Sequence, residues 1–227
     1  MGNKVSEEKS QNVQNAVVPV PDVGACYGHG WHQLWKHFLE LLLISIIAFV
    51  IGVPSGMGGG AKDITVLGGL LGFIGFVYTL LIVNPVDYGV SFAFLKAARR
   101  DKLEINDMFE AFKNYWNAVL ANLLVGVIVV IGLFLLFVPG IIFYCKLIFT
   151  RYLVVDRKMG VIEAIQESWR MTRGHTGEIF LIALLAIPFY IAGLICFLVG
   201  IIVAIMWVRL AFASLYYAVS NAEAEKS

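Results

Sequence analysis

The sequence predicts an all-α membrane protein with six transmembrane helices, and three observations lead to that prediction. First, 59% of the 227 residues are apolar and only 15% are charged, whereas soluble domains average about 45–50% and about 25%. The mean hydropathy is +0.81. Second, the apolar residues form continuous runs, which suit helices in lipid rather than the alternating strands of a barrel. Third, a helical span needs about 20 apolar residues, so the composition provides for about six.

Six apolar runs are predicted to be the spans. In chain order they are residues 38–53, 64–84, 115–138, 141–155, 179–199 and 201–220. Pro54 and Pro85 are expected to end the first two runs, because proline interrupts helices. Pro139, Gly140 and Gly200 are expected to form tight turns between neighbouring spans. The fourth run is the shortest and carries two basic residues.

Polar segments flank this predicted membrane domain of residues 23–220. Residues 1–22 are predicted to be a flexible tail and not a signal peptide, because they contain no apolar core segment. Residues 221–227 form a second polar tail. Gly2 fits a short myristoylation pattern, but a chain that spans the membrane does not need one weak acyl anchor. Lipidation of Gly2 is left open.

Basic residues are concentrated in two of the predicted loops. The loop after the second span and the loop after the fourth together hold nine of the 17 basic residues. The positive-inside rule therefore predicts that these loops and both termini face the cytoplasm. Basic residues near a membrane surface attract anionic headgroups. The predicted headgroup contacts are Lys96, Arg99, Arg100, Arg157, Lys158, Arg170 and Arg173.

A pattern recurs three times along the chain. Stretches rich in aromatic and basic residues begin at Gly28, Ile105 and Val161, and each runs into a predicted span. Amphipathic helices of this kind lie in the headgroup layer. The second and third copies also end alike, with VPGII from Val138 and LVGII from Leu198. The predicted architecture is three helical hairpins with cytoplasmic interfacial helices.

Several segments resemble an uncharacterised bacterial six-helix membrane family. They are VNPVDYGVSFAFLKAARR, VPGII, YLVVDRKMGVIEAIQESWRMTRGH and RLAFASLYYAV. That family is similar in pattern to the membrane portion of some glycerophosphoryl diester phosphodiesterases. The most specific matching positions are Pro139, Gly140, Asp156, Gly160, Glu163, Ala164, Ser168 and Gly174. The resemblance covers about residues 23–220 and implies a bacterial cytoplasmic (inner) membrane protein, with no catalytic residues to carry over.

Charged residues interrupt the apolar runs and form a candidate intramembrane cluster. Its members are Glu40, Lys146, Arg151 and Arg209. Charges inside a membrane are costly and mark functional sites. At 1.5 Å per residue, the two arginines lie roughly 16 Å and 13 Å from the nearest predicted turns. We expect Glu40 to pair with one of them. The alternatives are snorkelling of the basic side chains toward the headgroups and a transport or lipid-phosphate site.

Three glycines in the second span predict close helix packing. Gly68, Gly72 and Gly75 share one helical face, and small residues let a neighbouring helix approach closely. The neighbour is another helix of the same chain or, alternatively, the partner in a homodimer. The oligomeric state is therefore open.

A cysteine and two histidines have a spacing that suits a metal ion on a helix. Cys26, His29 and His32 are three residues apart, so their side chains share a face. Gly28 and Gly30 disfavour a rigid helix there, and histidines also occur at membrane interfaces for purely structural reasons. No metal is predicted, although the question is left open.

No known catalytic motif is present in the sequence. It contains no G-x-S-x-G, H-E-x-x-H, P-loop or C-x-x-C pattern, so we predict neither an enzyme nor a cofactor. The net charge of +1 gives no footprint for nucleic acid. The expected role is structural, interaction or envelope and lipid homeostasis, with membrane lipids or other membrane proteins as partners.

The alternative role is a small transporter or channel for an anion or a lipid that uses the intramembrane basic residues. Transporters hold their substrate in a polar site near the middle of the membrane. A polar cavity lined by Arg151 and Arg209 would therefore favour transport. A closed apolar bundle would favour the structural role.

Overall fold

The computed structural model describes residues 19–57, 66–135, 137–195 and 197–224, and these residues form helices without strands. The long helices are α3 (Phe38–Met57), α6 (Tyr115–Leu135), α10 (Thr176–Ile195) and α11 (Phe197–Ala224). A further long stretch joins α4 (Val66–Tyr78), the π-helix η2 (Thr79–Val83) and α5 (Asn84–Ala98). The shorter helices are α2 (Val23–Lys36), the 3-10 helix η3 (Ile105–Asn114), α7 (Phe137–Leu147), α8 (Thr150–Asp156) and α9 (Val161–Met171).

The helices confirm the predicted class, a multi-pass helical membrane protein. Among the described residues, four stretches are long and apolar enough to cross a membrane: Gly72–Ala98, Ile105–Phe134, Thr176–Leu194 and Gly200–Ala224. The pair Val23–Lys36 and Phe38–Pro54, bent by 93°, makes a fifth if it is one span. Large apolar side chains such as Phe49 and Phe134 are exposed, which suits a surface covered by lipid. The arrangement of six spans in three hairpins stays a prediction.

The second predicted span continues past Pro85, so the prediction that this proline ends the helix is wrong. Proline removes a backbone donor and crowds the carbonyl four residues earlier, which here belongs to Leu81. In the structure η2 directly precedes this point, and the Tyr115 hydroxyl donates a hydrogen bond to the Leu81 carbonyl oxygen at 2.9 Å. Because α6 satisfies the carbonyl that Pro85 leaves unpaired, the helix continues to Ala98. Asp87 therefore lies in a helix and not in a loop.

The fourth predicted span is two helices, α7 and α8, with a turn at residues 148–149. The carbonyl oxygen of Lys146, near the end of α7, accepts hydrogen bonds from the hydroxyls of Ser168 at 2.8 Å and Thr172 at 3.3 Å. These hydroxyls of the α9 segment satisfy a carbonyl that the end of a helix leaves free. The chain can therefore turn after α7. Helix α8 then runs in a different direction from α7 and carries Arg151 into the interior.

The repeated stretches each form a short helix before a long one: α2 precedes α3, η3 precedes α6 and α9 precedes α10. In the second and third units, the two helices of the hairpin also approach each other in the same way, at a glycine. A Cβ added to Gly140 would lie 2.7 Å from the backbone of Leu133, and one added to Gly193 would lie 2.7 Å from the carbonyl oxygen of Gly200. Both hairpins therefore depend on glycine at the point where the two helices cross. The prediction of tight turns at Pro139, Gly140 and Gly200 is wrong, because the first two lie within α7 and the third within α11.

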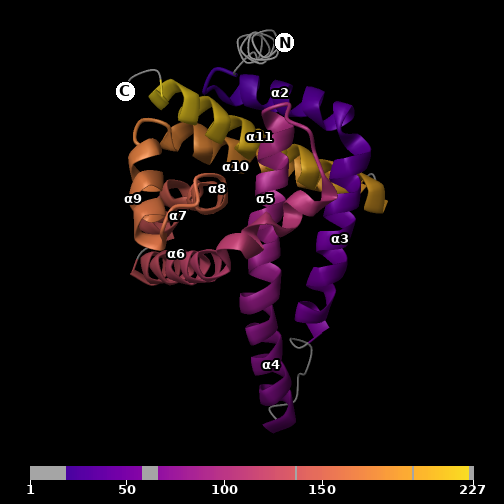
Figure 1. Cartoon of the computed structure of the whole chain (residues 1–227), viewed down its shortest axis with the longest axis vertical. Helices are drawn as coiled ribbons and strands as arrows, with labels where there is room; N and C mark the ends of the chain where they lie inside the picture. The colour runs from indigo at the N-terminus through magenta and orange to yellow at the C-terminus, as the bar shows by residue number, and fades with distance from the viewer. Residues whose placement is uncertain (1–18, 58–65, 136, 196, 225–227) are drawn as a thin grey trace, which may run out of the picture.

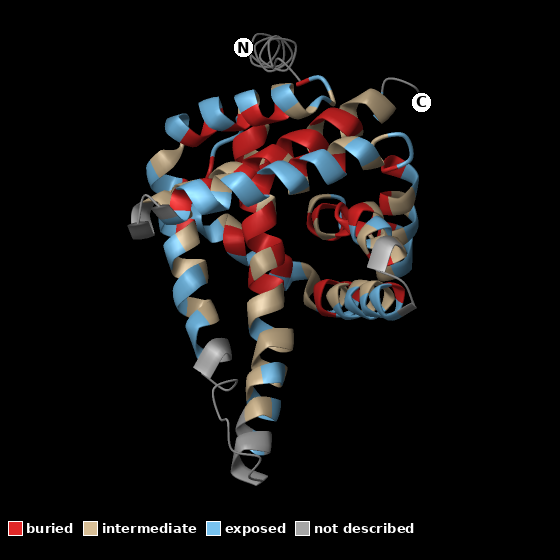
Figure 2. Ribbon diagram, turned by 180° about the vertical axis from the view of Figure 1, so that it is seen from behind, coloured by how far each residue is buried: buried red, intermediate tan, exposed pale blue. Residues whose placement is uncertain are grey.

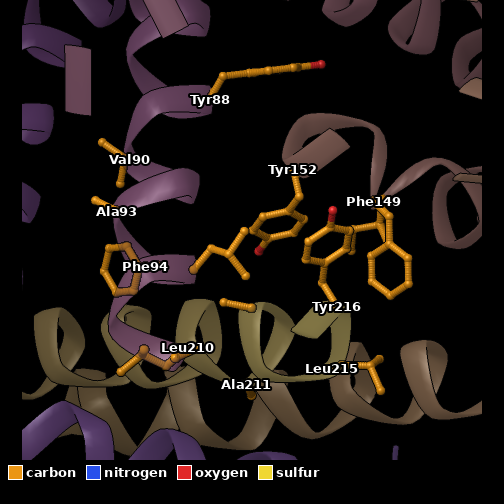
Figure 3. Close-up of a cluster of buried hydrophobic side chains, with 14 of the residues drawn as sticks. Tyr88, Val90, Ala93, Phe94, Phe149, Tyr152, Leu210, Ala211, Leu215 and Tyr216 are labelled. Carbon is orange, nitrogen blue, oxygen red and sulfur yellow. The ribbon is translucent and has the colours of Figure 1, made fainter. Parts of the chain in front are cut away.

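The helices cross one another in space. In Figure 1, α3 and α4 run side by side along the long axis, whereas α10 and α11 run across it. Figure 2 shows that the buried residues gather in α11 and the adjoining part of α5, away from the far end of α3 and α4. The core therefore lies where α5, α8 and α11 meet. In Figure 3, Tyr152 of α8 stacks on Tyr216 of α11, with ring centroids 5.0 Å apart.

One of the two predicted boundaries of the membrane domain, the C-terminal one, differs in the structure. Asp22 caps α2 by accepting a hydrogen bond from the amide of Ala25 at 3.2 Å, so the first helix begins at Val23. Helix α11 continues to Ala224, so the start of the predicted C-terminal tail is helical. Residues 1–18, which include Gly2, lie outside the described part of the chain.

Candidate functional site

Two arginines meet one aspartate inside the protein. Nη2 of Arg209, on α11, donates to Oδ1 of Asp87, on α5, at 2.7 Å. Nη1 of Arg151, on α8, donates to Oδ2 of the same carboxylate at 3.3 Å. Two positive charges face one negative charge, so this open cluster carries a net charge of +1. The three side chains are 33–35% exposed because they border cavities.

The open cluster corrects the prediction that Glu40 pairs with an arginine. Glu40 is exposed in the first turn of α3, and both arginines bind Asp87 instead. Lys146 lies apart from them, with its Nζ 4.7 Å from the ring centroid of Trp169. Asp87 was not expected as the partner, because the second span was predicted to end at Pro85. The signal that could have found it is the apolar run that continues beyond the proline, with Asp87 as its single acid.

An apolar groove of about 540 Å³ borders the open cluster on one side. It lies between α3, α5 and α11. Its apolar lining includes Ile46, Phe49, Val86, Val90, Ile202 and Ile205. Among the described residues around it, Asp87 and Arg209 are the charged ones. The groove can therefore take an apolar chain whose polar end reaches Arg209.

A smaller polar pocket of about 160 Å³ lies beside the same arginines. Arg151, Arg209 and three tyrosines, Tyr144, Tyr152 and Tyr190, contribute to its lining. Within the described part of the chain, the three tyrosine hydroxyls form no hydrogen bond. Nη1 of Arg209 also lacks a partner among these residues, but it is buried away from the pocket. Hydrogen-bond donors therefore exceed acceptors in this pocket. These tyrosines carry no shared signal in the sequence, since they come from three separate helices and belong to no motif.

A second arginine–carboxylate cluster joins the same helices. Arg99, just after α5, donates two hydrogen bonds to Asp156 of α8 at 2.5 and 2.7 Å, and the Tyr216 hydroxyl of α11 donates to Asp156 at 3.1 Å. Burial alone would lower the pKa of Arg99, but the hydrogen bonds and charge of Asp156 outweigh it and raise that pKa. One positive charge faces one negative charge, so we call this the closed cluster.

Most of the predicted headgroup contacts are paired within the chain. Lys96 binds Asp107 at 2.8 Å, Arg99 binds Asp156, Arg157 lies 3.3 Å from Glu167, and Arg170 binds Glu167 and Glu223 at 2.7 and 2.9 Å. Lys158 lies 4.0 Å from Glu110, whereas Arg100 and Arg173 are exposed and have no ion pair among the described residues. Five of the seven residues therefore pair with an acid of another segment, and two face outward.

The cysteine–histidine pattern does not gather in the fold. Cys26 is buried, Nδ1 of His29 lies 3.0 Å from the Ser214 hydroxyl, and His32 is exposed. In the part of the chain that the structure describes, no three histidine, cysteine or acidic residues are placed to hold a metal ion.

The helix that carries Gly68, Gly72 and Gly75 packs within the chain. These glycines lie in α4, which contacts α3. Packing between helices of the same chain is therefore present at α4. The homodimer through the same helix stays an alternative prediction.

Comparison with protein-family models, with curated proteins and with solved structures finds no match to this chain. The resemblance to the six-helix bacterial membrane family therefore stays an expectation. The function has to follow from the chemistry of the two cavities and of the open cluster between them.

Proposed function

We propose that this protein binds an anionic lipid within its helices and acts without catalysis in lipid homeostasis of the membrane. The observation that supports this most is that Arg209 borders both the apolar groove and the polar pocket. An anionic lipid has the matching chemistry, since an apolar chain is joined to one negative group. The chain would lie in the groove and the negative group at Arg151 and Arg209.

Charge and volume support this ligand. A net positive charge inside a membrane is costly, and a bound anion would neutralise the charge left by Asp87 and the two arginines. Ligand sites commonly enclose about 300–1,000 Å³ with a few polar groups, and the groove holds about 540 Å³.

The proposal includes the placement of the chain in a bacterial inner membrane, with both termini in the cytoplasm. The concentration of basic residues in two loops supports that orientation. The start of α2 and the end of α11 also lie at the same end of the molecule in Figure 1. Six spans would require α7 and α8 to cross together as one broken segment.

Mass spectrometry of lipids that co-purify with the full chain tests lipid binding. Arg209→Gln removes one cation but leaves the Asp87–Arg151 pair, and Ile205→Trp fills the groove from a partly exposed position. Arg173→Gln and Leu184→Trp are the matched controls, since both side chains are exposed and outside the groove. We expect an anionic lipid enriched over the membrane extract, retained by the controls and reduced in both test variants. Lipid that matches the bulk extract in every variant would contradict the proposal.

A second candidate function is movement of the same lipid across the membrane. It is favoured by the polar pocket lined by Arg151 and Arg209, the arrangement expected of a transport site. Vesicles that contain the purified chain and a fluorescent anionic lipid test it. Exchange between leaflets that is faster than in empty vesicles and slowed by Arg209→Gln would support transport, and exchange at the empty-vesicle rate would exclude it.

A further inference from the structure

We infer that the polar pocket is a phosphate-binding subsite formed by Arg151, Arg209 and the three tyrosines Tyr144, Tyr152 and Tyr190. This inference rests on the proposed lipid binding and narrows the ligand to one that carries a phosphate group instead of a carboxylate. The pocket is separate from the apolar groove, and the two share Arg209.

The number of donors distinguishes phosphate from carboxylate. The pocket combines two guanidinium groups with three hydroxyls that form no hydrogen bond in the described structure. The donors come from α7, α8, α10 and α11, so they approach from several directions. A phosphate group offers several oxygens in a tetrahedral arrangement, which suits such donors and the bidentate geometry of arginine. A carboxylate has only two oxygens in one plane, and Asp87 already supplies one such group.

Asp87 fixes the position of the Arg209 guanidinium. The carboxylate takes Nη2 of Arg209 at 2.7 Å, whereas Nη1 is buried and without a partner among the described residues. Because Nη1 is buried, a ligand in the pocket would meet the exposed remainder of this side chain, which is 35% exposed and lines the pocket. Asp87 thus orients the guanidinium at the border of the pocket.

The closed cluster positions one of the pocket tyrosines. Tyr152 is only 4% exposed and stacks on Tyr216, as Figure 3 shows. Tyr216 is in turn held by its hydrogen bond to Asp156 at 3.1 Å. The ring of Tyr152 is therefore fixed by packing, and its hydroxyl is not needed for that packing.

The size of the pocket suits a phosphate group. Its volume is about 160 Å³, which equals roughly five water molecules at about 30 Å³ each. A phosphate with a few attached atoms has room there. The lipid chain has no room in it and would have to occupy the groove on the other side of Arg209.

Binding measurements on the purified full chain in detergent test the subsite. The probes are a phosphatidate, a fatty acid of the same chain length and inorganic phosphate. The variant Tyr144→Phe/Tyr190→Phe removes two hydroxyls and no ring, and Tyr217→Phe is the matched control because that hydroxyl is outside the pocket. Ile205→Trp fills the groove alone. Thermal unfolding of each variant checks that it is folded.

We expect phosphatidate to bind about tenfold or more tightly than the fatty acid, since hydrogen bonds to charged groups are strong. The double tyrosine variant should lose about tenfold in phosphatidate affinity and none in fatty-acid affinity, and Tyr217→Phe should match the wild type. Equal affinity for both lipids, unchanged in the double variant, would overturn the subsite and leave lipid binding intact. Binding of inorganic phosphate as tightly as phosphatidate, insensitive to Ile205→Trp, would support the subsite and overturn the lipid proposal.

Discussion

The open and the closed clusters join the same three segments of the chain with opposite polarity. In the open cluster, α5 supplies the acid Asp87, and α8 and α11 supply the arginines. In the closed cluster, Arg99 at the end of α5 supplies the cation and α8 supplies the acid, Asp156, which Tyr216 of α11 also contacts. Each cluster therefore ties α5, α8 and α11 together.

The two clusters differ in charge balance and surroundings. The closed cluster is neutral overall, and the side chains of Arg99 and Asp156 are 25% and 11% exposed. The open cluster has an excess positive charge, borders two cavities and keeps unpaired donors. Buried ion pairs are by themselves weak signs of stability or function. The difference supports the proposal that the closed cluster holds the helices together, whereas the open cluster binds an anion.

The largest effect is expected when the closed cluster loses its acid. Asp156→Ala leaves Arg99 partly buried without its carboxylate and removes the acceptor of Tyr216. Removal of one partner of a buried pair costs about 3 kcal/mol or more. Thermal unfolding in detergent should show this loss whether or not lipid is added. Recovery of the lost stability on addition of an anionic lipid would contradict the purely structural role.

A smaller and ligand-dependent effect is expected in the open cluster. Asp87→Asn removes the negative charge and one of the two acceptor oxygens that bind Arg151 and Arg209, and loss of such charged hydrogen bonds costs about 2 kcal/mol. Here an anionic lipid should restore much of the stability, because it supplies the missing negative charge. A zwitterionic lipid with the same chains is the control. Equal rescue by both lipids would mean that the charge of this cluster does not select the ligand.

Removal of single tyrosine hydroxyls separates the structural role of the closed cluster from the ligand-binding role of the polar pocket. Tyr216→Phe removes the hydrogen bond to Asp156 and should lower the free energy of unfolding by about 1 kcal/mol. Tyr152→Phe removes a hydroxyl with no partner in the described structure, so the stability without ligand should stay unchanged while phosphatidate affinity falls. Unfolding and binding curves for the two variants give both values. The opposite pattern, with Tyr152→Phe the less stable protein, would reverse the assigned roles.

The helical class followed from local sequence, whereas the ion pairs did not. Continuous apolar runs determine helices in lipid, so the starts of α3 and α6 agree with prediction. The prediction that Pro85 ends the helix was wrong because the Tyr115 hydroxyl, which bonds the Leu81 carbonyl oxygen, comes from another helix. The break after α7 likewise depends on Ser168. Such long-range partners leave no local signal in the sequence.

The candidate site was predictable only in part. Arg151 and Arg209 were identifiable because arginine in an apolar run is unusual. Their partner was not, since proximity to Asp87 depends on how three distant segments cross. Glu40 was the wrong choice because it lies near the start of α3, with its side chain exposed. The pocket tyrosines were hidden among the nine tyrosines of the chain.

The smallest effect is expected where an ion-pair network lies at the surface. Hydrogen bonds from Arg170, with smaller contributions from Arg157, hold the pKa of Glu167 below its ordinary value. A carboxyl with a lowered folded pKa stabilises the protein above its unfolded pKa of 4.5, and that contribution disappears as the pH falls through the folded pKa. Arg170 is 58% exposed, so the contribution should be below about 1 kcal/mol.

Glu167→Gln measures how much this surface ion-pair network contributes to stability, for comparison with the open and closed clusters. The variant should unfold at a slightly lower temperature than the wild type at pH 7, and the difference should shrink as the pH falls below 4.5. It should also shrink in high salt, which screens exposed charges. The control is Glu163→Gln, an exposed acid of the same helix. A difference that persists at low pH would show that Glu167 acts through packing, and a loss as large as that of Asp156→Ala would place it with the closed cluster.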